Sequence, residues 1–125
     1  RIMTGSTKET HILMDVAADG KSYLSLYRGT TYSENGTQLT VYNLNEFSTN
    51  TSASAVYYAP TINNSGTLLY QDLLPGGRGA RVVGGEASTR AERILKTSTD
   101  YLLRVQNKSG NTADIAIEFM FYELE

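Results

Sequence analysis

The stretch that decides the fold reads Thr99-Asp-Tyr-Leu-Leu-Arg-Val-Gln-Asn107, then Lys108-Ser-Gly110, then Thr112-Ala-Asp-Ile-Ala-Ile-Glu-Phe-Met-Phe-Tyr-Glu123. Successive side chains of a strand face opposite sides of a sheet, so apolar residues at every second position share one face. That pattern predicts two strands, each with one buried side, joined by the Lys-Ser-Gly turn as a long antiparallel hairpin. The residues expected on the buried sides are Tyr101, Leu103 and Val105 in the first strand and Ile115, Ile117, Phe119 and Phe121 in the second.

The rest of the chain alternates strand-like runs with turn clusters, roughly 8 to 12 residues apart, which is typical of a sandwich or barrel. Asp19-Gly20 predicts a hairpin turn after the first run, and Pro60 stops the fourth because proline cannot continue a strand ladder. We therefore predict one all-β domain over residues 1–125, an antiparallel β-sandwich with jelly-roll or Greek-key topology. The expected strands before residue 75 cover residues 12–17, 22–28, 38–44, 53–59 and 66–72.

An internal repeat supports this fold. Thr31-Tyr-Ser-Glu-Asn-Gly-Thr-Gln-Leu39 and Thr61-Ile-Asn-Asn-Ser-Gly-Thr-Leu-Leu69 share the pattern Thr-x4-Gly-Thr-x-Leu. Each copy places a polar turn closed by glycine, which tolerates positive φ, directly before an apolar strand. Two copies are too few for a solenoid. They predict matching turns at corresponding corners of two Greek-key halves.

The composition limits the classes of partner that the chain is expected to bind. The net charge is −2, from 11 basic and 13 acidic residues, which gives no overall field to attract nucleic acid or anionic lipid. No apolar run approaches the roughly 20 residues that span a bilayer. The chain has no cysteine for a disulfide, a thiolate nucleophile or a Cys-based zinc site. We expect no nucleic-acid partner and no membrane partner.

Reactive residues are sparse. His11 is the single histidine, and Asp15, its nearest acid in sequence, would lie about 13 Å away along an extended strand. There is no Gly-x-Ser-x-Gly elbow, and Asp114, Glu118 and Glu123 pair with no recognisable second carboxylate. We therefore predict that the protein is not an enzyme and has no catalytic residue, cofactor or metal site.

Residues 75–93 differ in character from the rest of the chain. This segment holds five glycines and is locally basic. It lacks the Gly-Lys-Ser/Thr ending of a phosphate-binding loop. One interpretation is a flexible, solvated Gly/Arg-rich loop; the other is a docking loop that orders on an acidic partner surface, because arginine makes bidentate contacts with carboxylates. The predicted partner-binding residues are Arg78, Arg81, Arg90 and Arg93.

Tyrosine is unusually abundant, with nine residues against three phenylalanines and no tryptophan. Amphipathic aromatics at strand ends would explain this. A sugar-binding surface is the alternative, because a tyrosine ring can stack on an apolar sugar face while its hydroxyl bonds outward. On that interpretation the chain is a carbohydrate- or receptor-binding module of a phage or bacterial surface protein, and Tyr57, Tyr58 and Tyr70 are the residues to test.

One family resemblance spans residues 11–123. It is carried by Tyr27-Arg-Gly-Thr-Thr31, Asn35-Gly-Thr37, Ala59-Pro-Thr61, Ser65-Gly-Thr-Leu-Leu69, the glycine-rich residues 76–85, Arg93-Ile-Leu-Lys96, Tyr101-Leu-Leu-Arg-Val-Gln-Asn-Lys-Ser-Gly110 and the terminal Phe-Tyr-Glu123. In their order and spacing these motifs resemble the small jelly-roll decoration (cement or staple) proteins of tailed bacteriophages. The family usually has Trp where this chain has Arg93, and a Trp near the end where it has Phe121.

The resemblance implies a structural role. Such a protein would be made in the host bacterial cytoplasm and would bind the major capsid protein on the outer capsid surface of the virion. There it would reinforce contacts between neighbouring capsid subunits. Many weakly bound copies on a lattice would act together through high effective concentration, and a homo-oligomer, a dimer or trimer on a local symmetry axis, would suit that arrangement.

Overall fold

The computed structural model describes residues 1–76 and 92–124. Within these ranges the chain forms antiparallel strands and no helix. The strands are β1 (Ile2–Met3), β2 (Glu9–Ala18), β3 (Ser22–Arg28), β4 (Thr31–Glu34), β5 (Thr37–Leu39), β6 (Ala55–Tyr58), β7 (Thr61–Asn64), β8 (Thr67–Leu74), β9 (Arg93–Leu95), β10 (Asp100–Asn107) and β11 (Ile115–Leu124).

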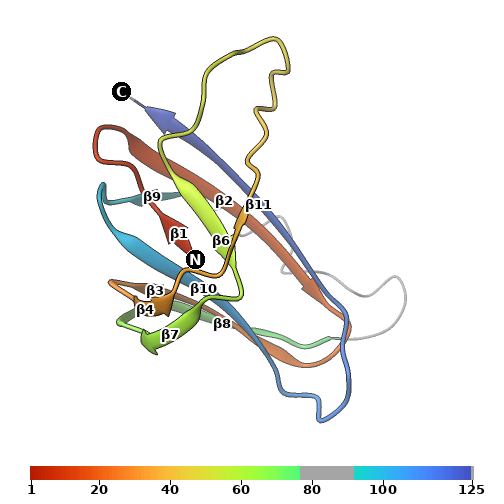
Figure 1. Cartoon of the computed structure of the whole chain (residues 1–125). Helices are drawn as coiled ribbons and strands as arrows, with labels where there is room; N and C mark the ends of the chain where they lie inside the picture. The colour runs from red at the N-terminus through yellow and green to blue at the C-terminus, as the bar shows by residue number, and fades with distance from the viewer. Residues whose placement is uncertain (77–91, 125) are drawn as a thin grey trace.

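Two sheets pack against each other, which confirms the predicted antiparallel sandwich (Figure 1). The larger of these two has the strand order β5-β6-β1-β10-β3-β8, and the other has the order β11-β2-β9. A third, two-stranded sheet consists of β4 and β7. Two clusters of buried side chains join the layers. Ile12 and Leu95 of the smaller sheet meet Leu26 and Tyr101 of the larger one in the first cluster, while Val16 belongs to the second. Burial of these apolar faces is the main force that holds the layers together.

The predicted hairpins are wrong, although the faces assigned to the strands are largely right. β10 pairs with β1 and β3, whereas β11 pairs with β2 in the other sheet. β2 and β3 likewise lie in different sheets, so the Asp19-Gly20 turn is also a crossover. A crossover lets the apolar faces of consecutive strands cover each other across the core, whereas a hairpin would set them side by side. The two crossovers bond to each other: the Lys108 amide donates to the Lys21 carbonyl at 2.7 Å, and the Asp114 amide donates to Asp19 Oδ1 at 2.8 Å.

The third predicted strand is too long. β5 ends at Leu39, and residues 40–54 leave the sheet as a long loop that rises from one end of the molecule before β6 begins (Figure 1). We call residues 40–54 the β5–β6 loop. The short strands β1, β4, β7 and β9 were not predicted, because such short segments carry too little alternation to be recognised.

The repeat has a clear structural counterpart. Its two copies are β4-Gly36-β5 and β7-Gly66-β8, and both glycines have positive φ, as predicted. The copies pair with each other through β4 and β7. Each copy also pairs with the strand that precedes the other copy. β5 of the first copy pairs with β6, which precedes the second copy, and β8 of the second copy pairs with β3, which precedes the first copy. Thr37 lies opposite Tyr58 in the first copy, and its equivalent Thr67 lies opposite Arg28 in the second. The pairings of residues 27–38 and 57–68 therefore follow a local two-fold relation.

Candidate interaction surface

Three of the four predicted partner-binding arginines, Arg78, Arg81 and Arg90, lie outside the described residues. The fourth, Arg93, is half-buried in β9, where its main chain lies opposite Ile12. Its guanidinium carbon sits 4.7 Å from the centre of the Tyr70 ring. Because Tyr70 belongs to the opposite sheet, this contact ties the two layers of the sandwich together.

The tyrosines predicted for sugar binding differ in their surroundings. Tyr70 is covered on one face by Arg93 and donates its hydroxyl to Asp72 at 3.0 Å; burial, reinforced by this bond, raises the pKa of Tyr70. Tyr57 has the Arg1 guanidinium carbon 5.1 Å from its ring centre. Tyr58 is 56% exposed. Two of the three rings therefore already stack with an arginine.

The arginine–tyrosine contact at Tyr57 recurs under the same two-fold relation. Arg104 stacks at 5.3 Å on Tyr27, which holds the position equivalent to Tyr57 in the other half. Arg1 also bonds to Asn35, and Arg104 bonds to Ser65, which are again equivalent positions. In both places one arginine stacks on a tyrosine and also bonds to the residue directly before the glycine of the repeat.

His11 has a carboxylate partner. It is not Asp15, the nearest acid in sequence, but Glu92, which is distant in the chain. The Nδ1 of His11 contacts Glu92, which also accepts a hydrogen bond from the Tyr122 hydroxyl. The His11 and Tyr122 rings stack with their centres 4.7 Å apart. The bond from Tyr122, followed by the contact with His11, lowers the pKa of Glu92. Neither partner is a nucleophile, and the cluster joins β2, β11 and the start of β9.

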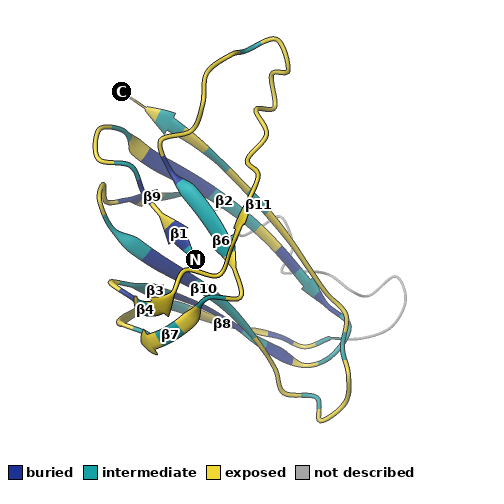
Figure 2. Cartoon of the chain, in the orientation of Figure 1, coloured by how far each residue is buried: buried dark blue, intermediate teal, exposed yellow. Residues whose placement is uncertain are grey.

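The most exposed apolar side chains of the described residues lie in the β5–β6 loop, which Figure 2 shows as an almost wholly exposed segment. Tyr42 is 82% exposed, Leu44 86% and Phe47 100%. Local bonds order the tip: the Asn45 amide donates to Asn43 Oδ1 at 2.9 Å, and the Phe47 amide donates to Asn45 Oδ1 at 3.2 Å. The loop therefore presents its apolar side chains from a hydrogen-bonded frame.

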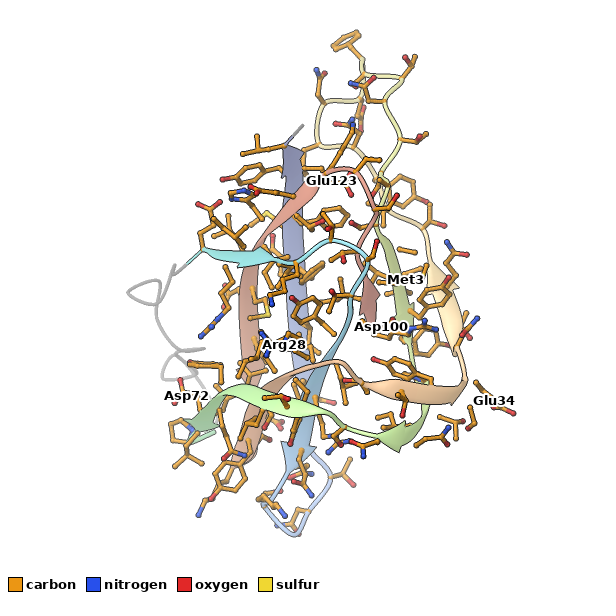
Figure 3. The ribbon with its side chains drawn as sticks, turned by 90° about the vertical axis from the view of Figure 1, so that its left-hand side faces the viewer. Met3, Arg28, Glu34, Asp72, Asp100 and Glu123 are labelled. Atoms are coloured by element: carbon orange, nitrogen blue, oxygen red, sulfur yellow. The ribbon has the colours of Figure 1, made fainter. Side chains whose placement is uncertain are left out.

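Glu123 anchors the returning end of this loop (Figure 3). Its carboxylate accepts hydrogen bonds from the amide of Ala53 at 2.9 Å, the amide of Ser54 at 2.8 Å and the hydroxyl of Ser52 at 3.2 Å. Partial burial raises the pKa of Glu123, but these bonds together outweigh it and lower the pKa overall. The sequence places Glu123 at a strand end with no recognisable partner, because its partners come from a distant part of the chain.

A groove of about 330 Å³ lies between the β5–β6 loop and β11. A second hollow of about 420 Å³ adjoins it and shares four lining residues with it: Val41, Tyr42, Leu44 and Phe121. Ile117 was predicted to be buried, but it lines this groove and is 50% exposed, although it lies opposite the buried Val16 of β2. β11, a strand of ten residues, lies at the edge of its sheet. Among the described strands it pairs only with β2, so its other edge has no strand partner. The main apolar lining residues are Leu39, Val41, Val56, Ile117, Phe119 and Phe121.

Two further features were searched for in the described part of the chain, a metal-binding group and a membrane-spanning helix, and neither was found there. Residues 1–76 and 92–124 contain no group of three or more His, Asp or Glu side chains placed to hold a metal ion. In the same ranges there is no helix long and apolar enough to cross a membrane.

Comparison with known proteins yields no relative. No family model matches the chain, and neither a curated protein nor a solved structure is significantly similar to it.

Proposed function

We propose that the chain is a structural virion protein that binds the outside of a tailed-phage capsid and reinforces contacts between neighbouring capsid subunits. The motif resemblance over residues 11–123 suggests this role. The structural observation that supports it best is the contact surface formed by the apolar β5–β6 loop and its adjoining groove. Exposed contiguous apolar patches of this kind are typical of protein interaction sites.

The architecture suits a protein that has to withstand strain. Two cross-layer clusters and the paired repeat join strands that are distant in sequence. Such contacts between distant parts of the chain should make local opening of the sandwich costly. On a capsid, each copy would need only a weak contact, because occupancy of neighbouring sites raises the effective concentration of the next contact.

Binding to isolated heads tests this function. The protein should co-sediment with expanded heads from a panel of tailed phages that includes the one encoding it, and it should raise the temperature at which those heads rupture. Unexpanded heads and tails are the matched controls. Failure to co-sediment with any expanded head, or binding without an effect on rupture temperature, would contradict the proposal.

The predicted arginines supply a variant series for the same assay. If the arginines bind capsid carboxylates in bidentate fashion, replacing Arg78, Arg81 and Arg90 by alanine should weaken head binding strongly. Replacement of the same three residues by lysine keeps the charge but loses the fork geometry, so an intermediate loss is expected. Equal binding by the wild type, the triple alanine variant and the triple lysine variant would place the capsid contact elsewhere on the chain.

Carbohydrate or receptor binding is the second candidate, favoured by the exposed rings of Tyr42 and Tyr58. A glycan array of host surface sugars would test it, with Tyr58→Ala as the variant and Tyr57→Ala as the control for a ring that stacks on arginine. Binding that is lost only in Tyr58→Ala would support a sugar platform. No binding across the array would count against it.

A further inference from the structure

We infer that an extended segment of a capsid subunit pairs with the free edge of β11 as an added strand, places alternate apolar side chains in the groove and carries a basic side chain beside Glu118. Only the identity of the partner as a capsid subunit rests on the proposed function. Three features of β11 favour a strand as the occupant: the direction of its main-chain groups, the side chains that line the groove and a pair of carboxylates on its outer face.

Every second residue of β11 directs its main-chain groups away from β2. The amide of Asp19 donates to the carbonyl of Asp114 at 3.1 Å, and these two residues continue the register in which Ile115 lies opposite Ala18. Hydrogen-bonded pairs alternate along an antiparallel ladder, so the even-numbered residues of β11 bond to β2 and the odd-numbered residues direct their N–H and C=O groups to the free edge. Among the described strands none pairs with that edge. Such a row of unpaired groups is a template for a further strand.

The groove lies where the side chains of an added strand would point. Its lining includes Ile117, Phe119 and Phe121, which are alternate residues of β11 and share one face of the strand. Phe119 and Phe121 pack against the buried core. A strand added beside β11 would continue this face, so its alternate side chains would enter the groove next to Leu39 and Val56 of the six-stranded sheet. The groove therefore fits an extended segment with apolar residues at every second position.

Burial along the strands agrees with an uncovered edge. β11 has no buried residue, although its partner β2 is buried at Ile12 and Val16, which are 1% and 5% exposed. Ile117, directly opposite Val16, is 50% exposed, and Leu39 of the six-stranded sheet is 44% exposed. An added strand would cover both of these apolar side chains, and burial of apolar surface is the main favourable term in association.

The charge pattern indicates which outward side chain the segment carries. Asp15 of β2 and Glu118 of β11 lie directly opposite each other, and both are exposed. Like charges at opposite positions destabilise a sheet. The salt bridges of the described residues include neither carboxylate. A lysine or arginine on the added strand, opposite Glu118 on the side away from β2, would bring a positive charge to this pair and relieve the repulsion.

The same carboxylates argue against a second copy of this chain as the source of the strand. Two β11 strands could pair edge to edge about a two-fold axis. The outer faces of the two strands would then form one surface, because opposed residues of an antiparallel pair share a face. That surface would gather the Asp15 and Glu118 carboxylates of both copies and increase the repulsion. A foreign segment with a basic residue is therefore favoured.

Hydrogen exchange, measured with single-residue resolution by mass spectrometry, tests the strand pairing on expanded heads. In the free protein the amides of Ile117, Phe119 and Phe121 should exchange rapidly, whereas those of Glu118 and Met120, which bond to β2, should exchange slowly. Binding to heads should slow exchange at the first three by at least about tenfold and leave the other two nearly unchanged. Slow exchange of the first three amides in the free protein, or no slowing on binding, would overturn the inference.

A pair of variants at Ile117 tests the edge itself. Ile117→Pro removes an N–H that points to the free edge and no bond to β2, a position at which an edge strand tolerates proline. It should weaken head binding by at least about tenfold. Ile117→Ala keeps the N–H and is the control, so it should retain most of the binding. Circular dichroism should show that both variants fold, and equal binding by the two would contradict the added strand.

A selection without capsids tests the chemistry of the segment. A display library of random peptides, screened against the protein, should yield segments with apolar residues at alternate positions and a lysine or arginine between them. Glu118→Lys should change the preferred charge from basic to acidic. Glu46→Lys is the control, because Glu46 is exposed but lines neither the groove nor the adjoining hollow, and it should leave the preference unchanged. No enriched peptide, enriched peptides without this alternation, or an unchanged preference in Glu118→Lys would overturn the inference.

The outcomes separate this inference from the proposed function. A protein that selects such peptides but binds no head would retain the strand-accepting edge and lose the capsid role. Head binding that leaves exchange at Ile117, Phe119 and Phe121 unchanged would retain the capsid role, and the added strand would be wrong.

Discussion

Gly36 and Gly66 occupy equivalent places in the repeat, and each lies against the main chain of the other half. A side chain added at Gly36 would collide with the carbonyl oxygen of Tyr58, and one added at Gly66 would collide with the carbonyl oxygen of Arg28. Tyr58 and Arg28 are themselves equivalent positions of the two halves. The halves are therefore locked together by a reciprocal contact that only glycine permits.

This relationship predicts that Gly36→Ala and Gly66→Ala destabilise the fold to a similar extent. Their φ angles are +83° and +82°, so alanine adds left-handed strain to the collision, and a loss of about 3 kcal/mol or more is expected in each case. Gly110→Ala is the control, since its φ is +79° but nothing lies within 4 Å of the added carbon. It should cost only about 1–2 kcal/mol. Urea unfolding measures all three, and equal losses would show that the reciprocal contact contributes nothing.

Loss of the Glu123 charge should loosen the β5–β6 loop. Glu123→Gln keeps the shape but weakens the bonds to Ala53 and Ser54, at a cost of about 1 kcal/mol for this partly exposed group. Amide hydrogen exchange at Ala53 and Ser54 should quicken, while Glu118→Gln, on the same strand, should leave it unchanged. Unaltered exchange in Glu123→Gln would contradict the anchoring role.

The same anchor should respond to acid. Because the hydrogen bonds lower the pKa of folded Glu123, its stabilising contribution is fully present above the ordinary glutamate pKa and is lost as the pH falls through the lowered value. The amide resonances of Ala53 and Ser54 should therefore shift together in an NMR titration, with a midpoint below that of an unperturbed glutamate. A midpoint at or above the ordinary value would contradict this.

Tyr122 should control the ionisation of Glu92. Removing the hydroxyl in Tyr122→Phe keeps the ring that stacks on His11 but deletes the bond that contributes most to lowering the pKa of Glu92. That pKa should rise toward its ordinary value, as measured by carboxyl-carbon NMR, and Tyr42→Phe should leave it unchanged. An unchanged Glu92 pKa in Tyr122→Phe would show that the hydroxyl is not the controlling donor.

Sequence reasoning recovered the strands better than their partners. The faces of β10 were correct because alternation at Tyr101, Leu103 and Val105 depends only on the period of a strand. Asp19-Gly20 and Lys108-Ser-Gly110 were misassigned as hairpin turns, since a tight polar turn can equally lead across a sandwich to the facing sheet. The repeat was informative because its glycine position has a strict conformational requirement.

The exposed apolar residues of the β5–β6 loop were harder to predict for a physical reason. Val41, Tyr42 and Leu44 resemble a strand, because a sequence does not distinguish apolar residues that are buried from apolar residues that are exposed in a loop. Contacts such as His11 with Glu92, and Glu123 with Ser54, join residues that are far apart in the chain. Only the folded arrangement brings these groups together.

Electron cryomicroscopy of expanded heads saturated with the protein tests the central claim most directly. The account predicts density for the β-sandwich on the outer capsid surface, placed over junctions between neighbouring capsid subunits. Heads that remain bare at saturating protein, or density confined to a tail or receptor-binding tip, would contradict it.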